Sequence, residues 1–384
     1  MSDSQNWKNT SLNHRLALSL LTASVVGLSA CGPQETQTPT AQQDCAPEKP
    51  VEEVATKASP LGSYTVDLSQ TSVSGLSSGA FMTSQLYMTH SDIMVGAGVI
   101  AGGPYLCALS KKFVAPLIPA TTTCMNPKDG EGPNLPRLEE MTQDLANKSK
   151  IDPVSNLADD RIYVFSGQAD KTVHPPVVDA TVQYFIDMGV PAESISYDNS
   201  VNAGHAIITD HADDVPCADT ASPYINNCNF MQSTRIIQQI YPGAQEPATS
   251  ATGQLIEFDQ TEFLPNEITS MSPNGFLYVP QSCASGTECK IHVAIHGCQQ
   301  GYESIQDQYY ATTGYNQMAD TNNLIILYPQ ASISHTIPYN PQGCWDFWGY
   351  SSYNYVDPDF YTQDAPQIKA IYAMLERLAG ADKK

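Results

Sequence analysis

The chain has 384 residues, 41% of them hydrophobic, which is enough to bury the core of one large domain or two ordinary ones. Its 18 basic and 40 acidic residues give a formal net charge of -22 at pH 7. This balance excludes nucleic-acid binding, because phosphates require a basic surface, and it identifies no other partner.

The first thirty residues have the pattern of an export signal. Lys8 and Arg15 precede the apolar run Leu16–Leu28, which is too short for a stable transmembrane helix, and the motif LSAC then ends at Cys31. This motif resembles the lipobox of bacterial lipoproteins, in which the cysteine thiol receives a diacylglyceryl group and becomes the new N-terminus. We therefore predict a lipoprotein signal peptide over residues 1–30 and lipidation of Cys31. The alternatives are an ordinary cleaved signal or cleavage after Cys31, and each of them exports the chain.

Residues 31–60 are polar, contain proline and lack periodicity, so we predict a flexible tether. A single catalytic domain is then predicted over residues 61–384. Gly32 follows the cysteine where aspartate signals retention at the inner membrane, so we predict an outer-membrane lipoprotein or a protein of the cell surface or periplasm, with secretion as the alternative. The predicted partners are therefore a substrate and, through the lipid, a membrane.

Export to an oxidising compartment accounts for the ten cysteines. With Cys31 set aside for lipid, nine remain, and Cys45 in the tether is the candidate for the unpaired thiol. The eight cysteines predicted to form disulfides are Cys107, Cys124, Cys217, Cys228, Cys283, Cys289, Cys298 and Cys344. No CxxC pair occurs and no cysteine has finger-like spacing to a histidine pair, so a zinc site is not predicted.

Short β-prone runs alternate with helical patterns from about Leu61 onward. The predicted strands are Tyr64–Leu68, Arg161–Phe165, Gly275–Val279, Ile291–Ile295 and Leu324–Tyr328, and the predicted helices are Gly79–His90, Val177–Met188 and Pro366–Ala379. The last helix has apolar residues along one face. Apolar strands that alternate with helices predict an α/β domain with a mostly parallel central sheet and helices on both faces.

The sequence Gly75-Leu76-Ser77-Ser78-Gly79 fits the G-x-S-x-G pattern of a nucleophile elbow. It follows β-prone Val73 and precedes a helical pattern, which is the strand–turn–helix context that an elbow requires. Glycines two residues either side of the serine are expected, because the tight turn has no room for larger side chains. We predict that Ser77 is the nucleophile and that the backbone N–H of Ser78 faces the developing oxyanion. The pentapeptide alone also occurs in ordinary Ser/Gly turns.

A serine nucleophile needs a base, and the base needs a carboxylate that orients it. In α/β-hydrolases the acid and then the histidine follow the serine, each in a loop after a strand. Asp170 follows the predicted strand Arg161–Phe165, and His205 follows the β-prone segment Ser194–Tyr197. We predict that they complete the triad, although Asp170 also suits a surface turn or a helix cap. Alternative bases are His174, His211 and His296.

A series of longer motifs occurs in one order along the chain. These are VSGLSSGAFM (Val73–Met82), AGGPYLCA (Ala101–Ala108), YVFSGQADKTV (Tyr163–Val173), AGHAIITD (Ala203–Asp210), SPYINNCN (Ser222–Asn229), GFLYVPQSCASG (Gly275–Gly286), HVAIHGCQQ (His292–Gln300), TGYNQMADTNNLIILYPQA (Thr313–Ala331) and NPQGCWDFWGY (Asn340–Tyr350). The series resembles the single-domain extracellular poly(3-hydroxybutyrate) depolymerases from about Tyr64 to the C-terminus. The resemblance implies the roles given above for Ser77, Asp170 and His205, and it adds the backbone N–H of Cys298 as an oxyanion donor.

The order of the elements predicts a circularly permuted α/β-hydrolase fold. In an ordinary member, the His-Gly oxyanion strand and the next two helices precede the nucleophile elbow. Here the strand Ile291–Ile295 lies far after Ser77, and the amphipathic helix Pro366–Ala379 ends the chain. Joining the C-terminus to Tyr64 restores the usual order, which requires that the two ends lie close together at the surface. The resembling family has this permutation.

The resemblance also implies disulfide pairs and substrate contacts. The implied pairs are Cys107–Cys124, Cys217–Cys228, Cys283–Cys289 and Cys298–Cys344, and the implied substrate-binding residues are Tyr105, Trp345 and Tyr350. The sequence departs from the family pattern at two places near the expected ester-binding crevice. Tyr350 stands where the family has an exposed tryptophan, and the loop Ser334–Gln342 is shorter than the family's. We expect Tyr350 to be exposed, and one or two of Trp345, Phe347 and Trp348 to belong to the core.

The leading functional hypothesis is hydrolysis of poly(3-hydroxybutyrate), or of related 3-hydroxyacid polyesters or oligomers, through an acyl-enzyme. The alternative enzyme is a carboxylesterase for feruloyl, acetyl or short soluble esters. A surface-binding lipoprotein on an inactive hydrolase scaffold is a third hypothesis, against which the intact Ser77, Asp170 and His205 argue. No metal or organic cofactor is implied, and a monomer is expected.

Overall fold

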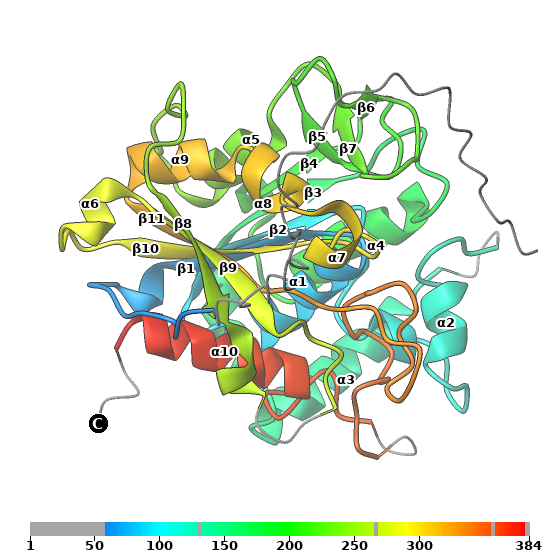
Figure 1. The fold of residues 1–384 in the computed structure, drawn as a ribbon. Helices are drawn as coiled ribbons and strands as arrows, with labels where there is room; N and C mark the ends of the chain where they lie inside the picture. Colours follow the sequence, from blue (N-terminus) through cyan, green and yellow to red (C-terminus); the bar gives the residue numbers. More distant parts are fainter. Residues whose placement is uncertain (1–57, 129–131, 265–267, 355–357, 381–384) are drawn as a thin grey trace, which may run out of the picture. The chain divides into compact units, whose positions relative to one another are not determined.

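The computed structural model describes residues 58–128, 132–264, 268–354 and 358–380 (Figure 1). The predicted signal peptide, Cys31, Cys45 and almost all of the predicted tether lie outside these residues. Within the described ranges, no helix combines the length and apolar character needed to cross a membrane.

Eight strands form one sheet in the order β4-β3-β2-β1-β10-β11-β9-β8. Their bounds are β1 (Thr71–Leu76), β2 (Met94–Ile100), β3 (Arg161–Phe165), β4 (Ile195–Asp198), β8 (Gln254–Asp259), β9 (Asn274–Val279), β10 (Lys290–Ile295) and β11 (Leu324–Tyr328). All neighbours are parallel except β9, which runs antiparallel to both β11 and β8. The central strands β1 and β11 are buried along their whole length, as their near-continuous apolar or small residues require.

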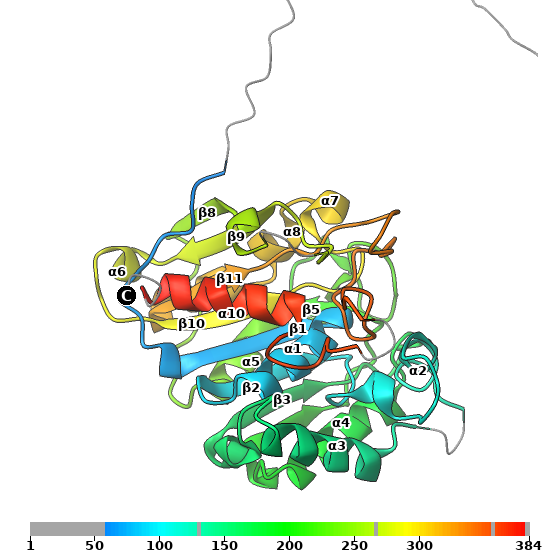
Figure 2. The same cartoon turned by 90° about the horizontal axis from the view of Figure 1, so that it is seen from below.

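Helices cover both faces of this sheet. They are α1 (Ser78–Thr89), α2 (Leu117–Thr121), α3 (Leu135–Asn147), α4 (Pro175–Asp187), α5 (Gln232–Ile240), α6 (Gln281–Ala284), α7 (Tyr302–Ile305), α8 (Gln308–Thr312), α9 (Tyr315–Asn322) and α10 (Pro366–Leu378). Figures 1 and 2 show α5 and α9 on one face and α1 and α10 on the other. Short 3-10 helices are η1 (Leu68–Gln70), η2 (Cys107–Leu109), η3 (Val154–Asp159), η4 (Ala192–Ser194) and η5 (Gln260–Phe263). The predicted α/β class is therefore confirmed.

The ends of the domain lie side by side. The backbone N–H of Tyr64 donates to the carbonyl of Leu378 at 2.8 Å, so the segment before β1 contacts the end of α10 (Figure 2). Joining them would make β8, β9, β10 and β11 precede β1 in sequence, and β1 already pairs with β10 in the sheet. This arrangement confirms the circular permutation.

A second, three-stranded parallel sheet follows β4. It has the order β5-β7-β6 and consists of β5 (Ile207–Thr209), β6 (Val215–Pro216) and β7 (Ile225–Asn227). All four expected disulfides are present, namely Cys107–Cys124, Cys217–Cys228, Cys283–Cys289 and Cys298–Cys344. The second of these links the residue after β6 to the residue after β7, within the segment that follows His205.

The predicted strand Tyr64–Leu68 is wrong. Only Val66 forms a bridge, to Cys289, and the chain then turns into η1. The carboxylate of Asp67 accepts the backbone N–H and the hydroxyl of Ser69, and these bonds favour a turn over an extended ladder. The β-prone composition therefore led to a wrong prediction here, because the hydrogen bonds of the Asp67 side chain compete with strand pairing.

Candidate active site

The nucleophile elbow has a strained backbone. Ser77 lies between the end of β1 and the start of α1 with φ 57° and ψ -121°, a conformation that non-glycine residues rarely adopt. Its N–H donates to the carbonyl of Ile100 at 3.0 Å, and its own carbonyl accepts from Ala80 and Phe81 in the first turn of α1. The strain presents the Ser77 hydroxyl at the positive end of a helix that is buried at every residue.

The two glycines of the elbow permit this geometry. A Cβ at position 75 would lie 2.4 Å from the carbonyl oxygen of Gly79, and one at position 79 would lie 2.3 Å from the carbonyl oxygen of His296. Both contacts are with backbone atoms, which cannot move away without disturbing α1 or the chain at the end of β10. The glycines predicted from the pentapeptide are therefore sterically required.

Asp170 and His205 meet at the carboxyl ends of the sheet. The His205 Nδ1 lies 2.7 Å from Asp170 Oδ2, and both side chains are buried. The other carboxylate oxygen accepts the backbone N–H groups of Thr172 and Val173 at 2.7 and 3.1 Å. The Asp170 carboxylate is thus fixed by its own loop, and His205 Nε2 is the ring nitrogen left to act on another group.

The loops that carry Asp170 and His205 are packed backbone to backbone. The N–H of Ala169 donates to the carbonyl of Ala203 at 3.0 Å, and a Cβ at Gly167 would lie 2.2 Å from that same oxygen. On its other side, the backbone N–H of His205 donates to the hydroxyl of Thr220. These contacts explain how residues 35 positions apart are held within hydrogen-bond distance.

The three alternative bases occupy other environments. His174 is partly exposed before α4, and His211 lies 3.7 Å from Asp214 at the surface. His296 is fully buried, its Nδ1 lies 2.7 Å from the Gly297 carbonyl, and its Nε2 accepts the N–H of Ala331. Burial lowers the pKa of His296 to about 4, so it stays neutral and supports the loop beneath the site.

Two backbone N–H groups are available beside Ser77. Ser78 is the first residue of α1, where the helix leaves the N–H without an intrahelical acceptor. In the described part of the chain, the N–H of Cys298 has no protein acceptor. Its loop is shaped by Gln300, which accepts from Gly297 N–H at 2.8 Å and donates to the carbonyls of Pro223 and Tyr224.

A crevice of about 640 Å³ joins these groups. Its lining includes Ser77, Ser78, His205 and Cys298 together with the apolar side chains Leu76, Phe81, Leu117, Met125, Val173, Phe347 and Trp348. Among the described residues that line it, none is Asp, Glu, Lys or Arg. The crevice is therefore suited to an uncharged, largely apolar ligand with a few polar atoms.

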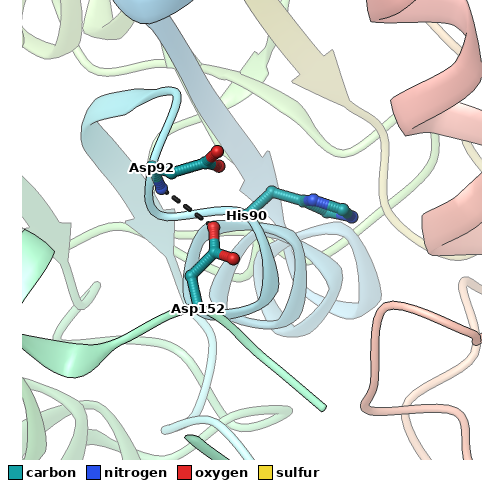
Figure 3. A group of neighbouring side chains, drawn as sticks. All are labelled: His90, Asp92 and Asp152. Carbon is teal, nitrogen blue, oxygen red and sulfur yellow. Dashed lines mark hydrogen bonds between the residues drawn. The ribbon is translucent and has the colours of Figure 1, made fainter. Parts of the chain in front are cut away.

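One possible metal-binding group lies elsewhere. Donor atoms of His90, Asp92 and Asp152 fall within 4.8 Å of one another (Figure 3), but none of the three lines the crevice. In Figure 3 the His90 ring points away from the carboxylates, and it stacks on Tyr372 with ring centroids 3.9 Å apart. Asp152 already accepts the N–H of Asp92 and the side-chain amide of Gln363. We assign this group to joining the end of α1 to the segment before α10.

Comparison with known proteins identifies the family. No protein-family model matches the chain. The chain is 40% identical over 324 residues to a poly(3-hydroxybutyrate) depolymerase of Delftia acidovorans, covering 83% of this chain and 61% of that protein. It is 38% identical over 312 residues to a polyhydroxybutyrate depolymerase of Talaromyces funiculosus, covering 77% of this chain and 87% of that protein. The chain belongs to the poly(3-hydroxybutyrate) depolymerase family.

Solved structures of depolymerases agree with this assignment. The crystal structure of the Penicillium funiculosum depolymerase matches with a TM-score of 0.74 at 34% identity, covering 84% of this chain and 99% of that one. A serine-to-alanine depolymerase variant complexed with an R3HB trimer matches with a TM-score of 0.75 and the same identity and coverage. The chain nevertheless spans only 61% of the length of the Delftia depolymerase.

The substrate contacts inferred from the depolymerase resemblance are not where we expected them. Tyr105, Trp345 and Tyr350 are all buried, and none of them lines the crevice. The expectation that Tyr350 is exposed is wrong: its hydroxyl donates to the carbonyl of Cys344 and accepts from the amides of Asn340 and Gln367. Tyr105 donates to the carbonyl of Tyr361 instead. The three hydrogen bonds of its hydroxyl thus keep the Tyr350 side chain in the interior.

The crevice is instead lined by residues of this chain that the sequence analysis did not name, or did not assign to either the core or the substrate site. Phe347 and Trp348 line it from the aromatic segment Trp345–Tyr350, Leu117 from α2, and Tyr339 from the loop before Gly343. Tyr339 was missed because the sequence shows only a shortened loop there. The one indication in the sequence was that Tyr339 lies in the loop Ser334–Gln342, which is shorter than the family's.

A buried carboxylate orders the aromatic segment. Asp346 Oδ1 accepts the backbone N–H groups of Trp348, Gly349 and Tyr350, and Oδ2 accepts the N–H and hydroxyl of Ser351. Burial raises the pKa of Asp346, and these hydrogen bonds oppose that rise. This nest of donors turns Tyr350 inward and leaves Phe347 and Trp348 facing the crevice.

Proposed function

We propose that this chain hydrolyses ester bonds of poly(3-hydroxybutyrate), or of closely related 3-hydroxyacid polyesters and oligomers, through an acyl-enzyme on Ser77. The observation that carries the proposal is that Ser77 and His205 line one uncharged crevice while Asp170 binds the far side of the imidazole. The names of the depolymerase relatives and the R3HB trimer of the structural neighbour support the choice of polymer.

In the first half of the reaction, the Ser77 oxygen attacks the ester carbonyl while His205 Nε2 takes the hydroxyl proton. Asp170 stabilises the imidazolium and keeps Nδ1 protonated. The N–H groups of Ser78 and Cys298 donate to the oxyanion of the tetrahedral intermediate. Collapse breaks the ester bond, and the proton passes from His205 to the departing alkoxide, which leaves as a hydroxyl-ended chain.

In the second half, water enters the crevice and gives a proton to His205 as its oxygen attacks the acyl carbonyl. The bond to Ser77 breaks, and the serine recovers a proton from His205. The released fragment ends in a carboxylate. None of these steps requires a metal or an organic cofactor.

The rim of the crevice favours polymer over a small soluble ester. Leu117 lines it from α2 and Tyr339 from the loop before Gly343, and they are 52% and 65% exposed. Close to them in sequence, Ile118 on α2, Phe113 before α2 and Ile337 before Tyr339 are all strongly exposed. Exposed apolar side chains around a site mark a surface for an apolar partner, here an insoluble chain.

The test compares amorphous poly(3-hydroxybutyrate) with p-nitrophenyl butyrate, using the purified domain. We expect clearing of the polymer suspension and release of 3-hydroxyacid fragments, both absent from Ser77→Ala. Rapid cleavage of feruloyl, acetyl or p-nitrophenyl esters without polymer clearing would favour the soluble carboxylesterase. Loss of neither activity in Ser77→Ala would remove Ser77 from the mechanism.

The four disulfides fit an exported protein. We further propose that the chain is a monomer, held at the outer membrane or cell surface by lipid on Cys31. In cells supplied with labelled palmitate, the wild-type chain should take up label and Cys31→Ser should not. An unlabelled wild-type chain whose mature N-terminus is not Cys31 would contradict the anchor.

A further inference from the structure

A histidine bridges two serines in the middle of the sheet. On β10, His292 Nδ1 lies 2.7 Å from the hydroxyl of Ser72, and its Nε2 lies 2.7 Å from the hydroxyl of Ser74, both on β1. All three residues are completely buried. Strands at the centre of a parallel sheet usually bury apolar side chains, so three polar groups at this place need an explanation.

The bridge belongs to a larger buried network. The Ser74 hydroxyl lies 2.6 Å from the hydroxyl of Tyr315 on α9, and the Tyr241 hydroxyl lies 2.9 Å from that of Ser72. We call Ser72, Ser74, Tyr241, His292 and Tyr315 the His292 network. It ties β1 and β10 to the helical layer of α5 and α9, and every ring nitrogen of His292 has a partner.

The imidazole in this network is neutral. Burial lowers the pKa of His292 to about 3, so one ring nitrogen donates and the other accepts over the range in which esterases work. A neutral, fully satisfied network adds little net stability compared with an apolar core of the same volume. Such networks act mainly by favouring one arrangement over its neighbours.

The two bridged strands end at the two halves of the reaction centre. β1 pairs with β10 in the register Ser72↔His292 to Gly75↔Ile295. β1 then leads into Ser77 and Ser78, and β10 leads into Gly297 and Cys298. A slip of one residue between them would displace the nucleophile from the Cys298 N–H by about 3.3 Å. Misplacement by about 1 Å can cost a catalyst 100-fold in rate.

We propose that His292 is a positioning residue that fixes the separation between the Ser77 hydroxyl and the Cys298 N–H by locking β1 against β10. The inference rests on the proposed function, in which both groups act on one carbonyl. It assigns His292 no contact with substrate.

The main test is a triple variant, Ser72→Ala, Ser74→Ala and His292→Leu. It removes the bridging polar side chains together, so that few buried groups are left without a hydrogen-bond partner. Its kcat for p-nitrophenyl butyrate should fall about 10-fold or more, with KM changed less than 2-fold. Active sites are counted by titration with a p-nitrophenyl organophosphate, so that kcat refers only to reactive Ser77. Tyr328→Phe, which removes a buried hydroxyl bond to Asn316 outside the network, is the matched control and should keep its kcat.

A role in folding alone would lower the fraction of reactive sites and leave kcat per site unchanged, which would overturn the proposal. If the triple variant does not fold, Ser72→Ala provides the measurement, because it frees one ring nitrogen and keeps Ser74. Its kcat per site should fall about 3-fold, and an unchanged value would also overturn the proposal. Because the readout is a soluble ester, it remains valid even if polymer hydrolysis itself is disproved.

Discussion

The two sides of the crevice are built on different principles. At the strand ends, Asp170 and His205 are buried and hydrogen-bonded, and Ser77 sits in a strained turn that two glycines make possible. The segments 110–121 and 332–342, which also line the crevice, carry Phe113 fully and Ile337 mostly in solvent. One side exposes little but its reacting atoms, and the other exposes whole apolar side chains.

This difference follows from what each side would have to do. Acyl transfer needs atoms fixed to within a fraction of an ångström in a site from which most water is excluded. A solid polyester offers no pocket-sized ligand, so an enzyme that attacks it must place apolar surface against the solid and expose that surface in solution. Substitutions on the two sides should therefore separate chemistry from polymer contact.

The largest effect is expected on the strand-end side. Ser77→Ala removes the proposed nucleophile and should lower turnover by about 10⁴-fold or more on polymer and soluble ester alike. Ser78→Ala is the matched control: it keeps the backbone N–H but deprives the Trp345 N–H of the hydroxyl that accepts it. We expect it to lose less than about 10-fold, measured as initial rate on p-nitrophenyl butyrate. If the two variants exchanged behaviour, the elbow assignment would be off by one residue.

The next largest effect is expected in the aromatic segment Trp345–Tyr350, which Asp346 orders. Asp346→Ala leaves buried N–H groups without acceptors, and we expect it to cost about 3 kcal/mol of unfolding free energy or more in urea. Asp364→Ala, which breaks only an exposed ion pair with Lys150, should cost under about 1 kcal/mol. Similar costs for both variants would contradict the ordering role of Asp346.

On the exposed side, the expected effect is selective rather than large. Tyr339→Ala should slow polymer degradation about 5- to 10-fold, because a lost aromatic contact is worth about 1–1.5 kcal/mol. Hydrolysis of p-nitrophenyl butyrate should change less than 2-fold. Tyr350→Phe, which removes a buried hydroxyl from the same region, should affect both substrates equally. Equal losses in Tyr339→Ala would mean that Tyr339 shapes the reaction centre instead.

The smallest effect lies outside the crevice and depends on pH. Burial, together with the Asp152 carboxylate, raises the pKa of Asp92 to about 6. The folded state therefore holds this proton more tightly than the unfolded state, and stability falls as pH rises from about 4 to 6. Asp92→Asn should raise Tm by about 1–2 °C at pH 8 and leave it unchanged at pH 4, where the Asp92 carboxyl is protonated and uncharged. The expected shift in Tm is small because solvent screens this exposed group. The exposed control Asp213→Asn should show no such difference between the two pH values.

The same contrast explains what could be predicted from sequence. The elbow, the strand Arg161–Phe165 and the loops that bring Asp170 to His205 follow from local rules, since a tight turn demands glycine and a buried strand demands apolar residues. Whether an aromatic side chain faces solvent depends on contacts made across the fold. Tyr350 is buried because Asn340 and Gln367 hold its hydroxyl, and no pattern near Tyr350 reveals this.

The most direct test follows soluble 3-hydroxyacid release from amorphous poly(3-hydroxybutyrate) by the wild-type domain and by Ser77→Ala, prepared at equal concentration. Mass spectrometry of the wild-type chain after organophosphate treatment should place the adduct on the peptide that contains Ser77. We predict fragment release by the wild-type enzyme before labelling, none by the variant, and none by the wild-type enzyme after labelling. Release that persists in Ser77→Ala, or a wild-type enzyme that labels on Ser77 but releases nothing from polymer before the treatment, would contradict the proposed function.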